Sequence, residues 1–159
     1  MKKYLKLVSA ALAVIGVVMM FFTQVTITWN HAPYHKEVLG LVALVGGDSQ
    51  YGVSFNGASS GLAGYILLGV AALILLVVAL VPYFKEHDML SAVVTGLAVV
   101  CAIVGVILIF LIRKNFSAAN GDMFKECVVG WAMIVGGSLG SLSALAGATS
   151  IIFDINGSN

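Results

Sequence analysis

The stretch that decides the fold is GLAGYILLGVAALILLVVALV, residues 61–81. It carries no charged side chain, and between Leu62 and Val81 it holds seven Leu, two Ile and four Val. At about −0.3 to −0.6 kcal/mol for each of these side chains, they favour insertion into a bilayer by roughly 4 to 8 kcal/mol in total. We therefore expect this stretch to cross a membrane.

Three further stretches share this lack of formal charge. The four uncharged runs cover residues 7–35, 49–84, 89–112 and 127–153, and each exceeds the roughly 18 apolar residues that indicate a spanning helix. Backbone groups in hydrocarbon must pair within their own segment, which favours helices. We predict spans near 5–23, 62–83, 90–112 and 127–152. The fold class is an all-α membrane protein, a four-transmembrane-helix bundle in one membrane domain, 1–159.

The composition excludes several classes of protein. Hydrophobic residues make up 60% of the chain and charged residues only 9%, whereas soluble domains carry roughly 25% charged residues. The net charge of +1 leaves no basic patch for nucleic acid. We expect membrane lipid around the helices and no nucleic-acid partner.

The basic residues suggest an orientation. Lys2, Lys3 and Lys6 precede the first apolar run, whose end, Met19 to Phe22, lacks the small residues of a signal cleavage site. We interpret it as an uncleaved anchor. Lys and Arg are divided four against four between the two sides, so the first helix decides. The expectation is a multi-pass protein of the cell membrane with both termini cytoplasmic.

The long outer loop, residues 24–61, shows strand character. Large apolar residues alternate with threonine in 25–29 and with small residues in 51–55, which is typical of half-buried strands. Residues 38–45 form an apolar stretch that we interpret as a short helix or a third strand. We predict a small extracellular antiparallel β-sheet formed by this first loop. Residues 113–126 are expected to be a short second outer loop with a turn at 120–122.

Small residues recur every four positions in the fourth run, on one face of a helix. They are Ala132, Gly136, Gly140, Ala144 and Ala148. Such a face lets a second helix approach closely. It indicates either a dimer interface or packing within the same bundle, and with three sibling helices available we favour the second.

Side chains that could carry chemistry are scarce. We expect no Asp, Glu, Lys, Arg or His at depth in any span, although transporters and intramembrane enzymes normally place such groups there. His31 and His35 have a metal-ligand spacing, but Pro33 between them disfavours the helix that this spacing needs. Cys101 and Cys127 are expected to be buried free thiols. We predict no enzyme activity, no cofactor and no metal.

Two resemblances follow from these features. A long first outer loop with strand character, a short second one and internal termini resemble the layout of claudin-like tetraspan proteins, and Trp29 resembles the tryptophan of their first loop. The loop's Gly-Leu-Trp motif and paired cysteines are absent. That layout implies a small sheet over a four-helix bundle and a role in cell contact or as an auxiliary subunit.

The Lys-rich start of the chain and the stretch from Phe22 to Thr26, where the first helix ends, are also similar to small uncharacterised four-span proteins of Gram-positive bacteria. That resemblance implies no particular activity.

The sequence therefore favours a non-enzymatic membrane protein that mediates protein–protein contact, as an accessory subunit, scaffold or self-assembling tetraspan. Its partner would be another membrane protein or a second copy. Candidate contact residues in the outer loop are Trp29, His31, His35, Tyr51 and Phe55. Two alternatives stay open: a component of a small oligomeric channel or transporter, and a lipid-binding membrane protein.

Overall fold

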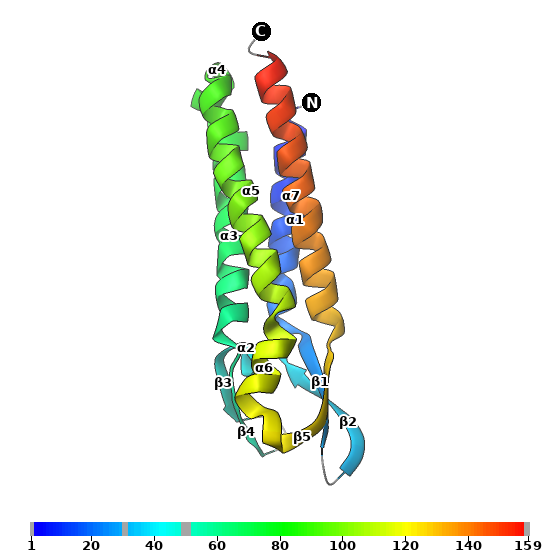
Figure 1. The fold of residues 1–159 in the computed structure, drawn as a ribbon. Coiled ribbons are helices and arrows are strands. Elements are labelled where there is room, and N and C mark those ends of the chain that lie inside the picture. The colour runs from blue at the N-terminus through cyan, green and yellow to red at the C-terminus, as the bar shows by residue number, and fades with distance from the viewer. Residues whose placement is uncertain (1, 30–31, 49–51, 158–159) are drawn as a thin grey trace.

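Four long helices run side by side in a computed structural model of the chain (Figure 1). The structure describes residues 2–29, 32–48 and 52–157. The long helices are α1 (Lys2–Val18), α3 (Ser59–Leu80), α5 (Asp88–Phe110) and α7 (Trp131–Gly157). A short helix, α4 (Tyr83–Glu86), joins α3 to α5. The described ends of the chain lie at one end of the bundle, and the β-strands lie at the other (Figure 1).

All four long helices are long and apolar enough to cross a membrane. The 22 residues of α3 correspond to about 33 Å at roughly 1.5 Å per residue, close to the hydrocarbon thickness of about 30 Å. Large apolar side chains also cover the outside of the bundle, as at Leu73 and Val93, which are 65% and 66% exposed. A surface of this kind belongs in lipid, so the protein is a multi-pass membrane protein.

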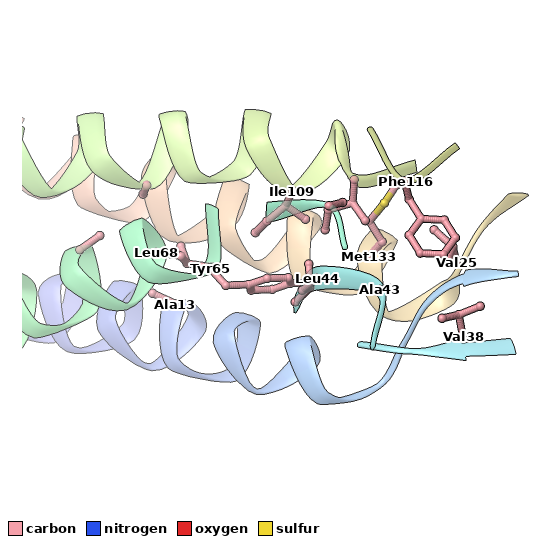
Figure 2. Packing of buried hydrophobic residues seen from close by; sticks show 14 of the residues in the cluster. Ala13, Val25, Val38, Ala43, Leu44, Tyr65, Leu68, Ile109, Phe116 and Met133 are labelled. Carbon is pink, nitrogen blue, oxygen red and sulfur yellow. The ribbon is translucent and has the colours of Figure 1, made fainter. Parts of the chain in front are cut away.

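The helices are arranged in chain order around the bundle. Contacts join α1 to α3, α3 to α5, α5 to α7 and α7 back to α1, so every neighbouring pair is antiparallel. The interior is filled by side chains such as Leu68, Leu75 and Ala98. Figure 2 shows that this core continues through Tyr65, Leu44 and Ile109 toward the strand end. The predicted four-helix bundle is confirmed.

Glycine brings α3 and α5 into backbone contact. A Cβ atom added at Gly64 would lie 2.7 Å from the carbonyl oxygen of Gly105, and one added at Gly105 would lie 2.7 Å from that of Gly64. Real Cβ contacts are never this short, so both positions require glycine. Lipid tails give helices no hydrophobic reason to associate, and close packing of this kind holds them together instead.

A three-stranded antiparallel sheet stands at the strand end. It consists of β1 (Thr23–Trp29), β2 (Ala32–Leu39) and β5 (Phe124–Val129), in the order β2-β1-β5. A short hairpin, β3 (Gly46–Asp48) with β4 (Ser54–Asn56), lies beside it, together with α2 (Gly40–Val45) and α6 (Ile112–Asn120). Single-turn 3-10 helices occupy 19–21 and 121–123. We call residues 23–58 and 112–130 the cap.

The predicted antiparallel sheet is confirmed, but its composition differs from the expectation. The predicted strand 25–29 lies within β1, and the stretch 38–45 ends in helix α2. Of the strand predicted at 51–55, only residues 54–55 lie in a strand, β4, and Tyr51 lies outside the described residues. The third strand of the main sheet, β5, comes from the second loop rather than the first. Consequently the fourth helix begins at Trp131, not near residue 127.

Gly130 explains this boundary. Its backbone N–H donates to the carbonyl oxygen of Gln24 at 2.8 Å. A Cβ atom there would lie 2.4 Å from the carbonyl oxygen of Thr23. Only glycine lets the chain leave β5 this close to β1 and enter α7.

The Gly64–Gly105 contact predicts the effect of a single methyl group. In α5, Gly105→Ala should destabilise the bundle by about 1 to 3 kcal/mol through overpacking. Gly96→Ala in the same helix is the matched control, because its new Cβ would lie 3.9 Å from the nearest heavy atom, Ile151 Cδ1. Apparent Tm in detergent should fall for G105A and stay level or rise for G96A. Equal Tm values for the two variants would contradict the close contact.

Candidate functional site

A buried charged cluster lies where α1, α5 and α7 meet near the terminal end of the bundle. The Lys6 Nζ donates to Asp154 Oδ2 at 2.7 Å and to Ser91 Oγ at 2.6 Å. The Ser91 hydroxyl in turn donates to Asp154 Oδ2 at 3.1 Å. The side chains of Lys6 and Asp154 are only 6% and 1% exposed. The cluster therefore joins three helices through one carboxylate oxygen.

This ion pair corrects the expectation that no ionisable group lies inside a span, because Lys6 and Asp154 both lie within candidate spans, near their outer ends. Lys6 lies one turn inside α1, and Asp154 lies within α7, which continues to Gly157. In the sequence each charge stands at the edge of an apolar run and looks like a boundary marker. Because α1 and α7 are antiparallel neighbours, the two edges meet at the same depth. Lysines at the outer end of the first run and an aspartate at the outer end of the last run were the signal that could have indicated the pair.

Burying the pair is costly unless its polar atoms find partners. Removing one member of a buried ion pair typically costs about 3 to 5 kcal/mol, because the other charge is left uncompensated. Here Asp154 Oδ2 accepts two hydrogen bonds, while Asp154 Oδ1 is buried and receives none from the described residues. The Thr95 hydroxyl, one turn further along α5 from Ser91, is likewise buried without a partner there.

A pocket of about 230 Å³ opens beside the cluster. Its wall combines charged side chains from the helix ends with apolar ones from α3 and α4: Lys3, Lys6, Asp88, Asp154, Val78, Ala79 and Phe84. The pocket thus contains two lysines and two aspartates at the terminal end of the bundle. In a membrane protein, an ionisable group within a span is by default a candidate functional site.

A second polar contact lies deeper between α1 and α7. The Ser9 hydroxyl donates to the carbonyl oxygen of Ser143 at 2.6 Å, and the Ser143 hydroxyl donates to that of Ser9 at 2.7 Å. Both side chains are fully buried. These two reciprocal hydrogen bonds give each hydroxyl a partner on the neighbouring helix. We therefore interpret the Ser9–Ser143 pair as a contact that stabilises the packing of α1 against α7.

The predicted small-residue stripe of α7 faces the inside of the bundle over most of its length. A Cβ atom at Gly136 would lie 3.3 Å from the carbonyl oxygen of Gly16, and one at Gly140 would lie 2.6 Å from Val106 Cγ2. Ala132 and Ala144 are buried, and Ala148 is half-buried. The two glycines therefore serve contacts of α7 with α1 and α5.

In the cap, aromatic rings from both loops form one cluster. Phe116 of α6 stacks on Phe124 of β5 with centroids 5.8 Å apart and planes 5° apart. Phe55 of β4 lies 5.5 Å from Phe116, and Trp29 of β1 lies 6.0 Å from Phe55. Phe55 is only 4% exposed and Trp29 is half-buried. Both of these candidate contact residues are thus engaged inside the cap.

The structure does not describe the side chains of the other candidate contact residues. His31 and Tyr51 lie outside the described residues. The backbone of His35 pairs with Thr28 in the sheet, but the side chain of His35 is not among those described.

Hydrogen bonds hold the two loops of the cap together, and one of them joins the cap to the bundle. The Asn120 side chain accepts from the Asn56 backbone N–H at 2.8 Å and donates to its carbonyl oxygen at 2.8 Å, which joins α6 to β4. The Arg113 Nε donates to the carbonyl oxygen of Cys127 at 2.8 Å. The Tyr65 hydroxyl of α3 donates to Gln24 Oε1 of β1 at 2.9 Å.

The two cysteines are free thiols. Burial raises the pKa of the Cys127 thiol, an effect that the nearby Arg113 charge partly offsets. The thiol therefore stays protonated near neutral pH, as expected of a small buried apolar side chain. Within the described part of the chain, no group of three His, Cys, Asp or Glu side chains has metal-binding spacing.

The molecule thus has two candidate functional regions. One is the cap at the strand end, which hydrogen bonds hold in place, and the other is the charged pocket at the end where the termini lie. No protein family, curated protein or solved structure was found to match the chain.

Proposed function

We propose that the chain is a non-enzymatic protein of the cell membrane whose cap contacts another membrane protein. The observation that supports this most is the anchoring of the cap. It is joined to α3 through Tyr65 and Gln24, and its two loops are joined by Asn120 and by the aromatic cluster. A surface held in this way loses little conformational entropy when a partner binds.

The surface best suited to such contact is the β5 edge of the sheet. Lys125, Glu126 and Val128 are exposed on this strand. At the opposite edge, β2 contains Pro33, which has no backbone N–H to pair with a further strand. We therefore expect recognition by side chains on β5, with charges that select the partner.

A charge exchange tests this surface. The double variant K125E/E126K keeps the net charge but reverses the pattern on β5. The chain supplies a matched control, because Lys85-Glu86 is the same dipeptide at the other end of the bundle. Chemical crosslinking in native membranes, followed by mass spectrometry, should show the partner adduct falling at least tenfold in K125E/E126K and unchanged in K85E/E86K. The proposal fails if the wild type gives no adduct, or if both exchanges leave its yield unchanged.

In this proposal the cap lies outside the cell and both termini lie in the cytoplasm. Support comes from the basic start of the first helix, which usually sets orientation. The start of α1 and helix α4 share one end of the bundle (Figure 1), so one orientation places Lys2, Lys3 and Lys6 on the same side as Lys85.

Orientation is measurable with single cysteines in a C101A/C127A background. Ala118 in the cap and Glu86 at the opposite end are both exposed, so A118C and E86C should fold. A membrane-impermeant maleimide should label A118C in intact cells and E86C only after permeabilisation. The reverse pattern would place the cap in the cytoplasm.

A further inference from the structure

The unpartnered oxygen of Asp154 points to a ligand. Asp154 is 1% exposed and lines the 230 Å³ pocket, while its Oδ1 receives no hydrogen bond from the described residues. A buried carboxylate oxygen without a donor carries a desolvation penalty that no hydrogen bond offsets. A ligand that donates a hydrogen bond to Oδ1 would remove this penalty.

The charges around the pocket restrict what such a ligand can be. Among the described side chains of the pocket wall, Lys3 and Lys6 are balanced by Asp88 and Asp154, so a ligand with net charge would disturb this balance. A zwitterionic ligand has no net charge and would leave this balance unchanged. Its cationic end would lie toward the aspartates, and its anionic end toward Lys3, which is exposed at the start of α1. At roughly 30 Å³ per water, the pocket has room for about eight waters, enough for a small zwitterionic group.

We propose that this pocket binds a zwitterion with a primary ammonium and a phosphate or carboxylate, its ammonium donating to Asp154 Oδ1. Two sources share this chemistry: the headgroup of an ethanolamine phospholipid and a free ethanolamine phosphate. The pocket is built from the ends of α1, α3, α5 and α7 and from α4, at the end of the bundle where headgroups begin. The inference is independent of the contact role of the cap.

Methylation of the ammonium gives a sharp test. A choline group has the same charge but no N–H, so it cannot donate to Oδ1. Phe84 in the pocket wall could still attract a choline group through its ring face, so choline is a demanding control. In native mass spectrometry from mixed micelles, the wild type should retain phosphatidylethanolamine at least fivefold over phosphatidylcholine of the same chains. In the second arm, calorimetry compares the binding of free ethanolamine phosphate with the binding of free choline phosphate.

Variants separate the pocket from general lipid adhesion. K3Q should reduce retention of the ethanolamine ligand, whereas K114Q, the same change at the exposed Lys114 of α6 at the opposite end, should not. K6M/D154M removes the pair as a neutral unit, a replacement that buried ion pairs often tolerate, and it should abolish the preference for ethanolamine over choline. Circular dichroism and Tm confirm that each variant is folded.

Each outcome decides the proposal. Preference in the lipid arm alone identifies a headgroup as the ligand, and preference in the soluble arm identifies a free zwitterion. The proposal is overturned if neither arm prefers ethanolamine, or if folded K6M/D154M keeps the preference of the wild type.

Discussion

Hydrocarbon supplies no hydrogen bonds, and the structure depends on meeting that constraint. The four spans meet it first by being helices, which pair their own backbone groups. Their few polar side chains meet it by pairing across helices, as Ser9 and Ser143 do through each other's carbonyl oxygens. Elsewhere the helices associate by close packing, as between α3 and α5, where Gly64 and Gly105 permit backbone contact. Among the described residues, the Thr95 hydroxyl and Asp154 Oδ1 are buried without a hydrogen-bond partner, and the ligand proposal rests on the second.

The same constraint separates the molecule into two regions. Outside hydrocarbon the chain can use strands, turns and short helices, and there the two loops form one cap around Phe116 and Phe124. The core shown in Figure 2 continues from Leu68 in the bundle to Val25 in the sheet, so the cap and the bundle share one packed interior. A surface on the cap is consequently held by the membrane helices beneath it.

The sequence allowed the spans to be predicted because the lack of charge over some twenty residues is a local property. The strand at 25–29 was equally local, since alternation shows within five residues. The strand β5, in contrast, could not be predicted from a local pattern. Its partner is about a hundred residues away, as in the pairing of Thr26 with Val128, and its apolar end continues into the last span. The pairing of Lys6 with Asp154 was missed for the same reason, because only the antiparallel packing of α1 and α7 brings the two charges together.

Hydrogen–deuterium exchange in lipid nanodiscs tests the central claim most directly, since it reports the protection of each backbone amide. The account predicts that amides throughout α1, α3, α5 and α7 exchange slowest. It also predicts that the β5 amides from Phe124 to Val129 exchange faster than those of α7, with a change at Gly130. Rapid exchange along the length of any of the four helices, or uniform protection running from residue 124 into α7, would contradict it.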